Sequence, residues 1–284
     1  MRFGIGIDIG GTKIRAARVS EAGETQLLMV QPTASQAGDV VGQIDALIAA
    51  LESADAIGIG IPGRVDVAAG TIFSGGFVDL SGAPLAGRLR SAGTSPIFID
   101  NDANMALAAE ARIGAAAGLD HVVMLTIGTG IGGAIMGEGR LVHGRATAGQ
   151  LGHITIDLDG LPCLCGRKGC LETMSSGTAL GRLIAGAGLA ATTTAHELLN
   201  RTDEAAHAII AAWALPLRAG IDSLAAILDP QRVILGGGLG RDACTALERF
   251  PATAPWYQCD IAPAQLGDNA GVIGAALSAL ERAL

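Results

Sequence analysis

The sequence predicts an α/β protein with two similar halves. Stretches whose apolar residues alternate, as in half-buried strands, are interleaved with stretches whose apolar residues recur at helical spacing. A strand, a glycine turn and a second apolar strand begin the chain, and the same order returns at Val122–Gly133. Ile7-Asp8-Ile9-Gly10 then corresponds to Leu125-Thr126-Ile127-Gly128. So short a match also arises by chance, but with the alternating pattern it favours duplicated α/β halves.

The first predicted strand covers Phe3–Ile9, where isoleucines alternate with small or polar residues. Gly10-Gly11 then forces a turn, and Ile14 begins the returning strand. A helix is expected over residues 39–51, with Asp39 as its N-cap, because the apolar residues that follow recur at helical spacing.

Two further strands and a helix are expected before the midpoint of the chain. Alternating isoleucines at 57–61 predict a strand that Pro62-Gly63 ends. Ile97–Ile99 predicts a short strand, closed by Asp100-Asn101-Asp102. The alanine-rich segment after it predicts a helix that ends at Gly114.

Helices are expected to dominate the chain beyond residue 172. Ser176 is a candidate N-cap, and Thr194 with Glu197 has the spacing of a capping box. Apolar residues at helical spacing predict a long buried helix over residues 210–228. Residues 233–235 predict a strand, and the last helix is expected over residues 271–284.

The composition narrows the class of protein and of partner. The 284 residues are 50% hydrophobic, which is enough to bury the core of one or two domains. A formal net charge of −8 and only 3% aromatic residues argue against a nucleic-acid partner. No signal peptide is recognisable, and no apolar run reaches the ~18 residues that cross a bilayer. Because the five cysteines also argue against a disulfide framework, we expect a cytoplasmic protein without a membrane partner.

Three cysteines and one histidine form a complete ligand set for tetrahedral zinc. The cysteines lie in a glycine-containing loop, and the histidine ends a turn that precedes it. Four protein ligands leave no open position on the ion, so the sequence predicts structural zinc. The ligands would be His153, Cys163, Cys165 and Cys170. The alternative is a group of buried or reactive thiols without a metal.

Three glycine turns that follow strands predict a site for a nucleoside triphosphate. Backbone N–H groups in such turns approach phosphate oxygens, and hydroxyl and ammonium groups beside them add to the binding. Asp8, ahead of the first turn, would hold Mg²⁺ through water. The residues assigned to ATP and magnesium are Asp8, Gly10, Gly11, Thr12, Lys13, Gly128, Thr129, Gly130, Gly236, Gly237 and Gly238. The alternative is that all three turns are only hairpins or helix entries.

Asp102 is the candidate catalytic base. It follows an apolar strand and precedes a helix, where a carboxylate faces a binding cleft in many α/β proteins. Phosphoryl transfer to an alcohol needs a carboxylate that orients and deprotonates the hydroxyl. Asp100 competes with Asp102 on spacing alone, and either residue is equally suited to be a helix N-cap. The remaining histidines, His121, His143, His196 and His207, have no ligand-like neighbours in the sequence and are expected at the surface or in helices.

Taken together, these motifs resemble those of the ROK family of sugar kinases and sugar-responsive repressors. The resemblance covers the whole chain. It rests on the segments 8–13, 60–63, 101–104, 126–133, 152–153, 163–172 and 236–238. It implies an actin-like ATPase fold, with duplicated lobes of the ribonuclease H type and a cleft between them. It also implies that Asp102 is the base, that the final helix returns to the N-terminal lobe and that the protein is a homodimer.

The resemblance also implies which residues contact the sugar. They are Gly63, Arg64, Asn101, Asp102, His153 and Glu172. Two positions differ from the pattern of the family. Gln150 stands where a glutamate is common, and Asp79 stands where an asparagine is common. Glutamine keeps hydrogen-bonding capacity but loses the charge, so both positions bear on which sugar is bound.

The expected function is therefore an ATP-dependent kinase that phosphorylates the 6-hydroxyl of a hexose such as glucose, or of an N-acylhexosamine such as N-acetylmannosamine or N-acetylglucosamine. The expected lobes are residues 1–118 with the helix 270–284, and residues 119–269. The alternative is a sugar-binding ROK-type regulator without kinase activity. Such a regulator needs a DNA-reading module and a basic surface, and the negative net charge disfavours it.

Overall fold

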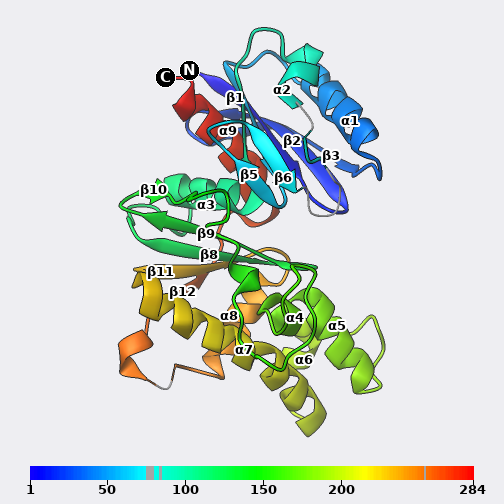
Figure 1. Cartoon of the computed structure of the whole chain (residues 1–284), viewed down its shortest axis with the longest axis vertical. Helices are drawn as coiled ribbons and strands as arrows, with labels where there is room; N and C mark the ends of the chain where they lie inside the picture. The colour runs from blue at the N-terminus through cyan, green and yellow to red at the C-terminus, as the bar shows by residue number, and fades with distance from the viewer. Residues whose placement is uncertain (75–79, 83–84, 253) are drawn as a thin grey trace. The chain divides into compact units, whose positions relative to one another are not determined.

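The computed structural model describes residues 1–74, 80–82, 85–252 and 254–284 (Figure 1). Its contacts divide the chain into two compact units. Unit 1 consists of Met1–Gly118, Leu141–Ala148 and Asp268–Leu284, and unit 2 of Leu119–Arg140 and Gly149–Gly267. The short segment Leu141–Ala148 therefore packs with unit 1, an assignment that the expected lobe boundaries did not include. Those boundaries stay a prediction.

Unit 1 is built on a five-stranded sheet with the order β3-β2-β1-β4-β7. β1 pairs antiparallel with β2 and parallel with β4, which in turn pairs parallel with β7. The strands are β1 (Phe3–Ile9), β2 (Lys13–Ser20), β3 (Thr25–Pro32), β4 (Ala56–Ile61) and β7 (Ile97–Asn101). β3 was not predicted, because its largely exposed apolar residues do not alternate with polar ones.

Alternation along β1 decides which helices cover the two faces of this sheet. Ile5, Ile7 and Ile9 pack into the core that α1 (Ala37–Ala50) covers. The residues between them face the C-terminal helix α9 (Ala270–Arg282) at very short range. A Cβ atom on Gly6 would lie 1.8 Å from the carbonyl oxygen of Val272, so only glycine permits this approach. Asp8 continues the same face and is thereby brought beside Gly271 of α9.

The remaining elements of unit 1 are short, apart from α3, which packs on α9. They are β5 (Arg64–Asp66), β6 (Thr71–Ser74), α2 (Leu85–Arg88), η1 (Arg90–Ala92), α3 (Asp102–Ile113) and η4 (Gly267–Asn269), the last of which starts at the end of unit 2. The expected N-cap of α1 was wrong. The cap is Gln36, whose side chain makes no capping hydrogen bond, and Asp39 lies inside the first turn.

Unit 2 repeats the topology on its own sheet, with the order β10-β9-β8-β11-β12. β8 pairs antiparallel with β9 and parallel with β11, as β1 does with β2 and β4. The strands are β8 (Val122–Ile127), β9 (Ile131–Gly137), β10 (Arg140–Leu141), β11 (Arg232–Gly236) and β12 (Asp260–Pro263). The shared strand order agrees with the predicted duplication.

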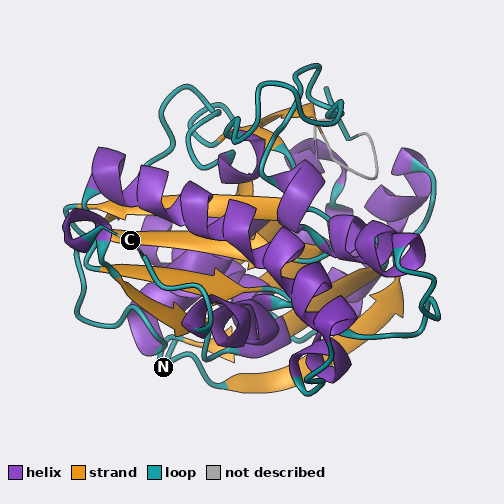
Figure 2. Ribbon diagram, turned by 90° about the horizontal axis from the view of Figure 1, so that it is seen from below, coloured by secondary structure: helices purple, strands orange, loops and turns teal. Residues whose placement is uncertain are grey.

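The helices of unit 2 pack with its sheet around one hydrophobic core. Figure 2, which views the molecule from below, shows helices lying over the strands. They are η2 (Leu151–His153), α4 (Glu172–Ser175), α5 (Gly177–Gly186), α6 (Ala195–Leu199), α7 (Glu204–Leu228), α8 (Gly240–Glu248) and η3 (Pro255–Tyr257). The predicted caps are confirmed: Ser176 accepts from Ala179 N, and Thr194 with Glu197 forms a capping box.

α7 is the longest helix of the described residues, and its buried side includes Trp213 and Leu217. Among those residues it is the one helix whose length and composition would suit a membrane span. Half of its most apolar window is buried inside the unit, and the buried core helix of a folded domain passes the same test. We therefore treat α7 as a core helix.

Candidate active site and metal site

The end of β7 and the start of α3 carry the candidate base. Asn101 is the N-cap of α3, and its side-chain oxygen accepts hydrogen bonds from the backbone N–H groups of Ala103 and Asn104. The alternative in which Asp100 or Asp102 is only an N-cap is therefore contradicted. Because Asn101 takes the capping position, the two aspartates are available for other contacts.

Asp102 lies in the first turn of α3 and is half-buried. Its Oδ1 accepts hydrogen bonds from Asn101 Nδ2 and from the backbone N–H of Ala103, both at 2.9 Å. Burial raises the pKa of this carboxyl group, while these hydrogen bonds oppose the rise. A carboxylate with a raised pKa is a better proton acceptor, which suits a general base.

Asp8 is the second carboxylate of this region. Its pKa is raised to about 7 by burial and by the negative charge of Asp102, while the Arg15 guanidinium lowers it. Arg15 is itself paired with Asp268, with 2.6 Å between Nη2 and Oδ2. A carboxylate whose pKa is raised by a second carboxylate nearby favours a bound cation, so the donor set fits a hydrated Mg²⁺.

The first glycine turn joins β1 to β2. Gly10 N donates to Lys13 O at 2.9 Å, and Gly10 O accepts from Thr33 Oγ1 at 2.7 Å. Gly11, Thr12 and Lys13 form its exposed tip. The hydroxyl and ammonium groups predicted to bind phosphate are therefore accessible, whereas the polar backbone atoms of Gly10 are used to close and brace the turn.

Asn101 also connects the candidate base to the loop after β4. Its Nδ2 donates to Gly63 O at 2.9 Å as well as to Asp102. Gly63 has φ +100°, a conformation that side-chain-bearing residues rarely adopt. Arg64 reaches the backbone oxygen of Ala146 at 3.4 Å and lies 5.5 Å from the ring centre of Phe73. Asp79, the other predicted sugar contact of unit 1, lies outside the described residues.

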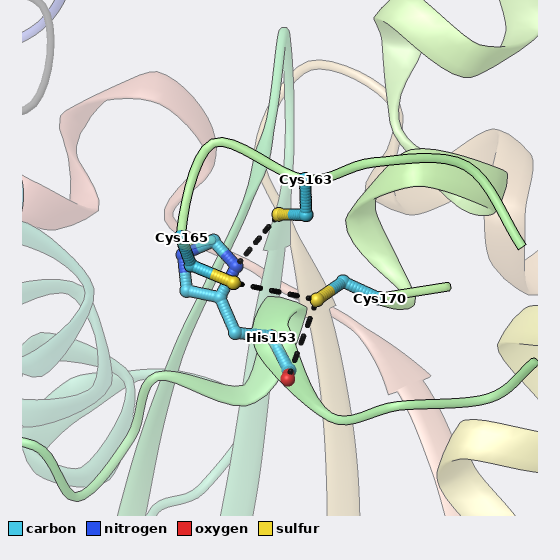
Figure 3. Close-up of side chains that lie close together, drawn as sticks. All are labelled: His153, Cys163, Cys165 and Cys170. Carbon is cyan, nitrogen blue, oxygen red and sulfur yellow. Dashed lines mark hydrogen bonds between the residues drawn. The ribbon is translucent and has the colours of Figure 1, made fainter. Parts of the chain in front are cut away.

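In unit 2 the four predicted zinc ligands come together. Their ligand atoms all lie within 4.8 Å of one another, and Figure 3 shows the four side chains converging on a common centre. Cys163 Sγ lies 3.5 Å from His153 Nδ1, and Cys165 Sγ lies 3.5 Å from Cys170 Sγ. Two sulfurs on a tetrahedral zinc, each ~2.3 Å from the ion, lie roughly 3.8 Å apart. The spacing is therefore close to that of a zinc site.

The protonation chemistry of the cluster also fits a metal. Burial raises the pKa of Cys165, but hydrogen bonds from Arg167 and from the neighbouring thiols bring it down to about 7. Burial and the neighbouring thiols of Cys165 and Cys163 raise the pKa of Cys170 to about 12. Three thiolates so close together need a cation, because each negative charge disfavours the next. A bound zinc would supply that charge and favour the deprotonated form of its ligands.

Glu172 follows the last cysteine closely and begins α4. Its Oε2 accepts a hydrogen bond from the backbone N–H of Ile131 at 2.8 Å. The same oxygen would lie 2.4 Å from a Cβ placed on Gly130, so the carboxylate rests directly against the second glycine turn. Gln150, the N-cap of η2, has its backbone oxygen bonded to His153 N at 3.1 Å.

The second and third glycine turns lie against each other in unit 2. Gly237, at φ +75°, faces the backbone of Ile127, and Leu239 N donates to the same residue's carbonyl oxygen at 3.0 Å. The N-terminus of α5 meets the second turn, where Gly177 N donates to Gly128 O at 2.8 Å. Helix N-termini and glycine turns both present backbone N–H groups, the groups that bind phosphate. Residues 236–238 thus lie against the strand end that leads into residues 128–130, and both turns belong to one candidate phosphate-binding region.

In unit 1, sequence reasoning missed one residue beside the candidate base, His143. Its Nε2 lies 2.7 Å from Asp100 Oδ2, whereas the sequence indicated no ligand-like neighbour. The pair joins positions 43 apart, so no helical or strand spacing could have revealed it. The only local signal was Asp100 itself, a carboxylate at the end of an apolar strand.

The chain is similar to known proteins along almost its whole length. The ROK family model matches residues 4–282. The chain belongs to the ROK family. A glucokinase of Halalkalibacterium halodurans is 33% identical over 96% of this chain and 93% of its own length. An N-acetylmannosamine kinase of Yersinia pestis is 33% identical over 98% of both chains.

Solved structures of the ROK family confirm the predicted actin-like ATPase fold. A ROK glucokinase of Streptomyces griseus in complex with glucose and AMPPNP has a TM-score of 0.84 at 32% identity, covering 98% of this chain and 99% of its own. A ROK-family transcriptional regulator, a homologue of the E. coli MLC protein, has a TM-score of 0.83 at 24% identity, covering 99% of this chain and 78% of its own. Kinases and regulators therefore share this fold, and the three relatives above with 32–33% identity are sugar kinases.

Proposed function

We propose that this ROK-family protein is an ATP-dependent sugar kinase that phosphorylates the 6-hydroxyl of a hexose or an N-acylhexosamine. The observation that carries the proposal is the placement of Asp102, a half-buried carboxylate with a raised pKa at the end of β7. The similarity to glucokinases and N-acetylmannosamine kinases over nearly the whole chain supports it.

In the proposed reaction Asp102 accepts the proton of the sugar hydroxyl as its oxygen attacks the γ-phosphorus. A new oxygen–phosphorus bond forms, the bond to the bridging oxygen of ADP breaks, and ADP leaves. Lys13 and Thr12 on the first turn, with Thr129 on the second, would bind the phosphates through side chains and turn amides. Catalysis would then come mainly from positioning and electrostatic stabilisation. Asp8 would hold Mg²⁺ through water, and the ion would neutralise charge on the phosphoryl oxygens.

His153, Cys163, Cys165 and Cys170 would hold a structural zinc ion. His153 faces Cys163 through Nδ1. If Nδ1 ligates the ion, the other ring nitrogen is left to donate a hydrogen bond to a sugar hydroxyl. The remaining proposed sugar contacts are Gly63, Arg64, Asp79, Asn101, Gln150 and Glu172. A homodimer and a cytoplasmic location stay predictions.

The test is a coupled ADP-release assay with ATP, Mg²⁺ and a panel of glucose, mannose, fructose, N-acetylmannosamine and N-acetylglucosamine. We expect one sugar to give a clearly higher kcat/KM than the others, with the product phosphorylated at O6 by ³¹P and ¹³C NMR. Sugar binding by calorimetry without ADP release from any member of the panel would contradict the proposal and favour a regulator.

A further inference from the structure

The segment Leu141–Ala148 is attached to unit 1 through its first turn. His143 Nε2 lies 2.7 Å from Asp100 Oδ2, and Ala146 O accepts from Arg64 Nε at 3.4 Å. The turn itself is closed by the hydrogen bond from Ala146 N to His143 O, at 3.1 Å. Asp100 is almost fully buried, and the His143 side chain is about one-third exposed.

Asp100 is the centre of a small hydrogen-bond network. Its Oδ1 accepts from Asn101 N at 2.6 Å and from Asn104 Nδ2 at 2.8 Å, while Oδ2 faces His143. A buried carboxylate is tolerated when its oxygens are paired, and it is strongly unfavourable when a partner is removed. Without His143, Oδ2 would lose a partner that can carry positive charge.

The network reaches the candidate base in two steps. Asp100 fixes the backbone N–H of Asn101, and the Asn101 side chain bonds both Asp102 Oδ1 and Gly63 O. Since Asp100, Asn101 and Asp102 are consecutive, a shift of Asp100 would move the N-cap of α3 and the carboxylate that follows it. A displacement of about 1 Å at a reacting group is enough to lower a rate by about 10²-fold.

We propose that His143 is a positioning residue, and that its ion pair with Asp100 holds the end of β7 so that Asp102 is correctly oriented toward the acceptor hydroxyl. This inference rests on the proposed kinase function. His143 itself touches neither the hydroxyl nor the phosphates in this scheme, and acts only through Asp100 and Asn101.

The charge of His143 adds a pH dependence to this role. The hydrogen bond to Asp100 raises the pKa of His143, burial opposes the rise, the charge of Asp100 adds to it and the Arg282 guanidinium on α9 lowers it. The charged pair is therefore complete below the ordinary histidine pKa of about 6.5. It weakens as the pH rises through the higher pKa of the folded protein. The neutral ring still donates a hydrogen bond, so activity should decline rather than vanish.

The test compares His143→Leu and His143→Gln with the wild-type enzyme on the sugar that the panel identifies. His143→Leu should lower kcat about tenfold and leave the KM of the sugar within about twofold, because orientation of the base is lost rather than binding. His143→Gln keeps a neutral donor, and it should recover part of kcat and lack the alkaline decline seen in the wild type. The matched control is His121→Leu, because His121 is an exposed histidine of unit 2. This substitution should change neither kcat nor the KM of the sugar.

A second measurement does not depend on turnover. In an NMR titration the His143 imidazole should titrate above the ordinary range in the wild type and shift down in Asp100→Asn. Wild-type kcat in His143→Leu, an alkaline decline that persists in His143→Gln, or an unchanged titration in Asp100→Asn would each overturn the inference. A wild type that releases no ADP with any sugar overturns the kinase function instead, and the two failures are thereby distinguished.

Discussion

At the scale of single residues, Asp102 and Asp39 share a position but not an environment. Both are in the first turn of a helix, α3 and α1 respectively. Asp39 is exposed, whereas Asp102 is half-buried, hydrogen-bonded to Asn101 and has a raised pKa. Both carboxylates interact similarly with the dipole of their helix. A comparison of the same substitution at the two positions therefore separates the proposed proton transfer from this shared effect.

Asp102→Asn should lower kcat by about 10²–10⁴-fold, because an amide cannot accept the proton. Sugar affinity should change little, since the amide is nearly the same shape and its oxygen still accepts hydrogen bonds. Steady-state kinetics and calorimetric titration of the sugar measure the two effects separately. Asp39→Asn is the matched control and should retain wild-type kinetics. Near-normal turnover in Asp102→Asn would remove the base from the mechanism.

Glu172 provides a second test at this scale. Its carboxylate holds Ile131 N beside Gly130, so Glu172→Ala should loosen the second glycine turn. Hydrogen bonds to charged groups contribute about 1.5–3 kcal/mol, which corresponds to a rise of about tenfold or more in the KM of ATP. Glu172→Gln retains an oxygen acceptor and should restore much of the affinity. If both variants bind ATP normally and only the sugar KM rises, Glu172 serves the sugar alone.

At the scale of elements, the loop of residues 153–170 brings four potential metal ligands together. We expect one zinc ion per chain in the purified protein, measured by inductively coupled plasma mass spectrometry. Cys170→Ser should lose the ion, because Cys170 is fully buried in the ligand set and a hydroxyl is a poor replacement for a thiolate. The loss should raise the sugar KM, since Glu172 and His153 depend on this loop. The control is Cys259→Ser, which lies outside the ligand set and should leave the zinc content unchanged. A wild-type protein without zinc would refute the site.

The packing of α9 on the sheet gives a second prediction at this scale. A Cβ on Gly58 would lie 1.8 Å from the carbonyl oxygen of Ala275, so Gly58→Ala must push helix and sheet apart. We expect a loss of about 1–3 kcal/mol in the free energy of unfolding, measured by denaturant titration. The control is Gly42→Ala in α1, where the added methyl meets no atom within 4 Å. It should stabilise the protein by about 0.4–1 kcal/mol. Equal effects of both substitutions would contradict the packing argument.

At the scale of the whole molecule, the features predicted correctly are those whose signal is local. The convergence of His153 with the three cysteines is one of them, because all four residues lie within one short stretch; the zinc itself stays a prediction. The strand, glycine turn, strand order identified both sheets, because alternation is a property of consecutive residues. Asn101 was missed as the N-cap because it lies between two aspartates, and all three residue types are good N-caps. Which of them is the cap depends on the residue at which the helix begins, and α3 begins at Asp102.

The features that the sequence could not predict depend on contacts between distant residues. His143 meets Asp100 only because the segment Leu141–Ala148 packs with unit 1 although its neighbours on both sides pack with unit 2. Asp8 is beside Gly271 because α9 packs on β1. The spacing of a titratable group along the chain carries no information on such partners, and a resemblance to a family supplies only the positions that its motifs share.

Ligand binding should be visible as stabilisation of the whole chain, and this separates recognition of the sugar from its phosphorylation. A ligand that binds only the folded state, present at about 100 times its Kd, stabilises a protein by about 2.7 kcal/mol. For a chain of this size we expect a rise of several degrees in Tm with the sugar that is the best substrate, and a smaller rise with sugars that bind more weakly at the same concentration. Asp102→Asn should show the same rise although its turnover is lost, because its proposed role begins after binding. If the sugar no longer raises the Tm of Asp102→Asn, Asp102 acts in binding, and the loss of activity in that variant would not support a base.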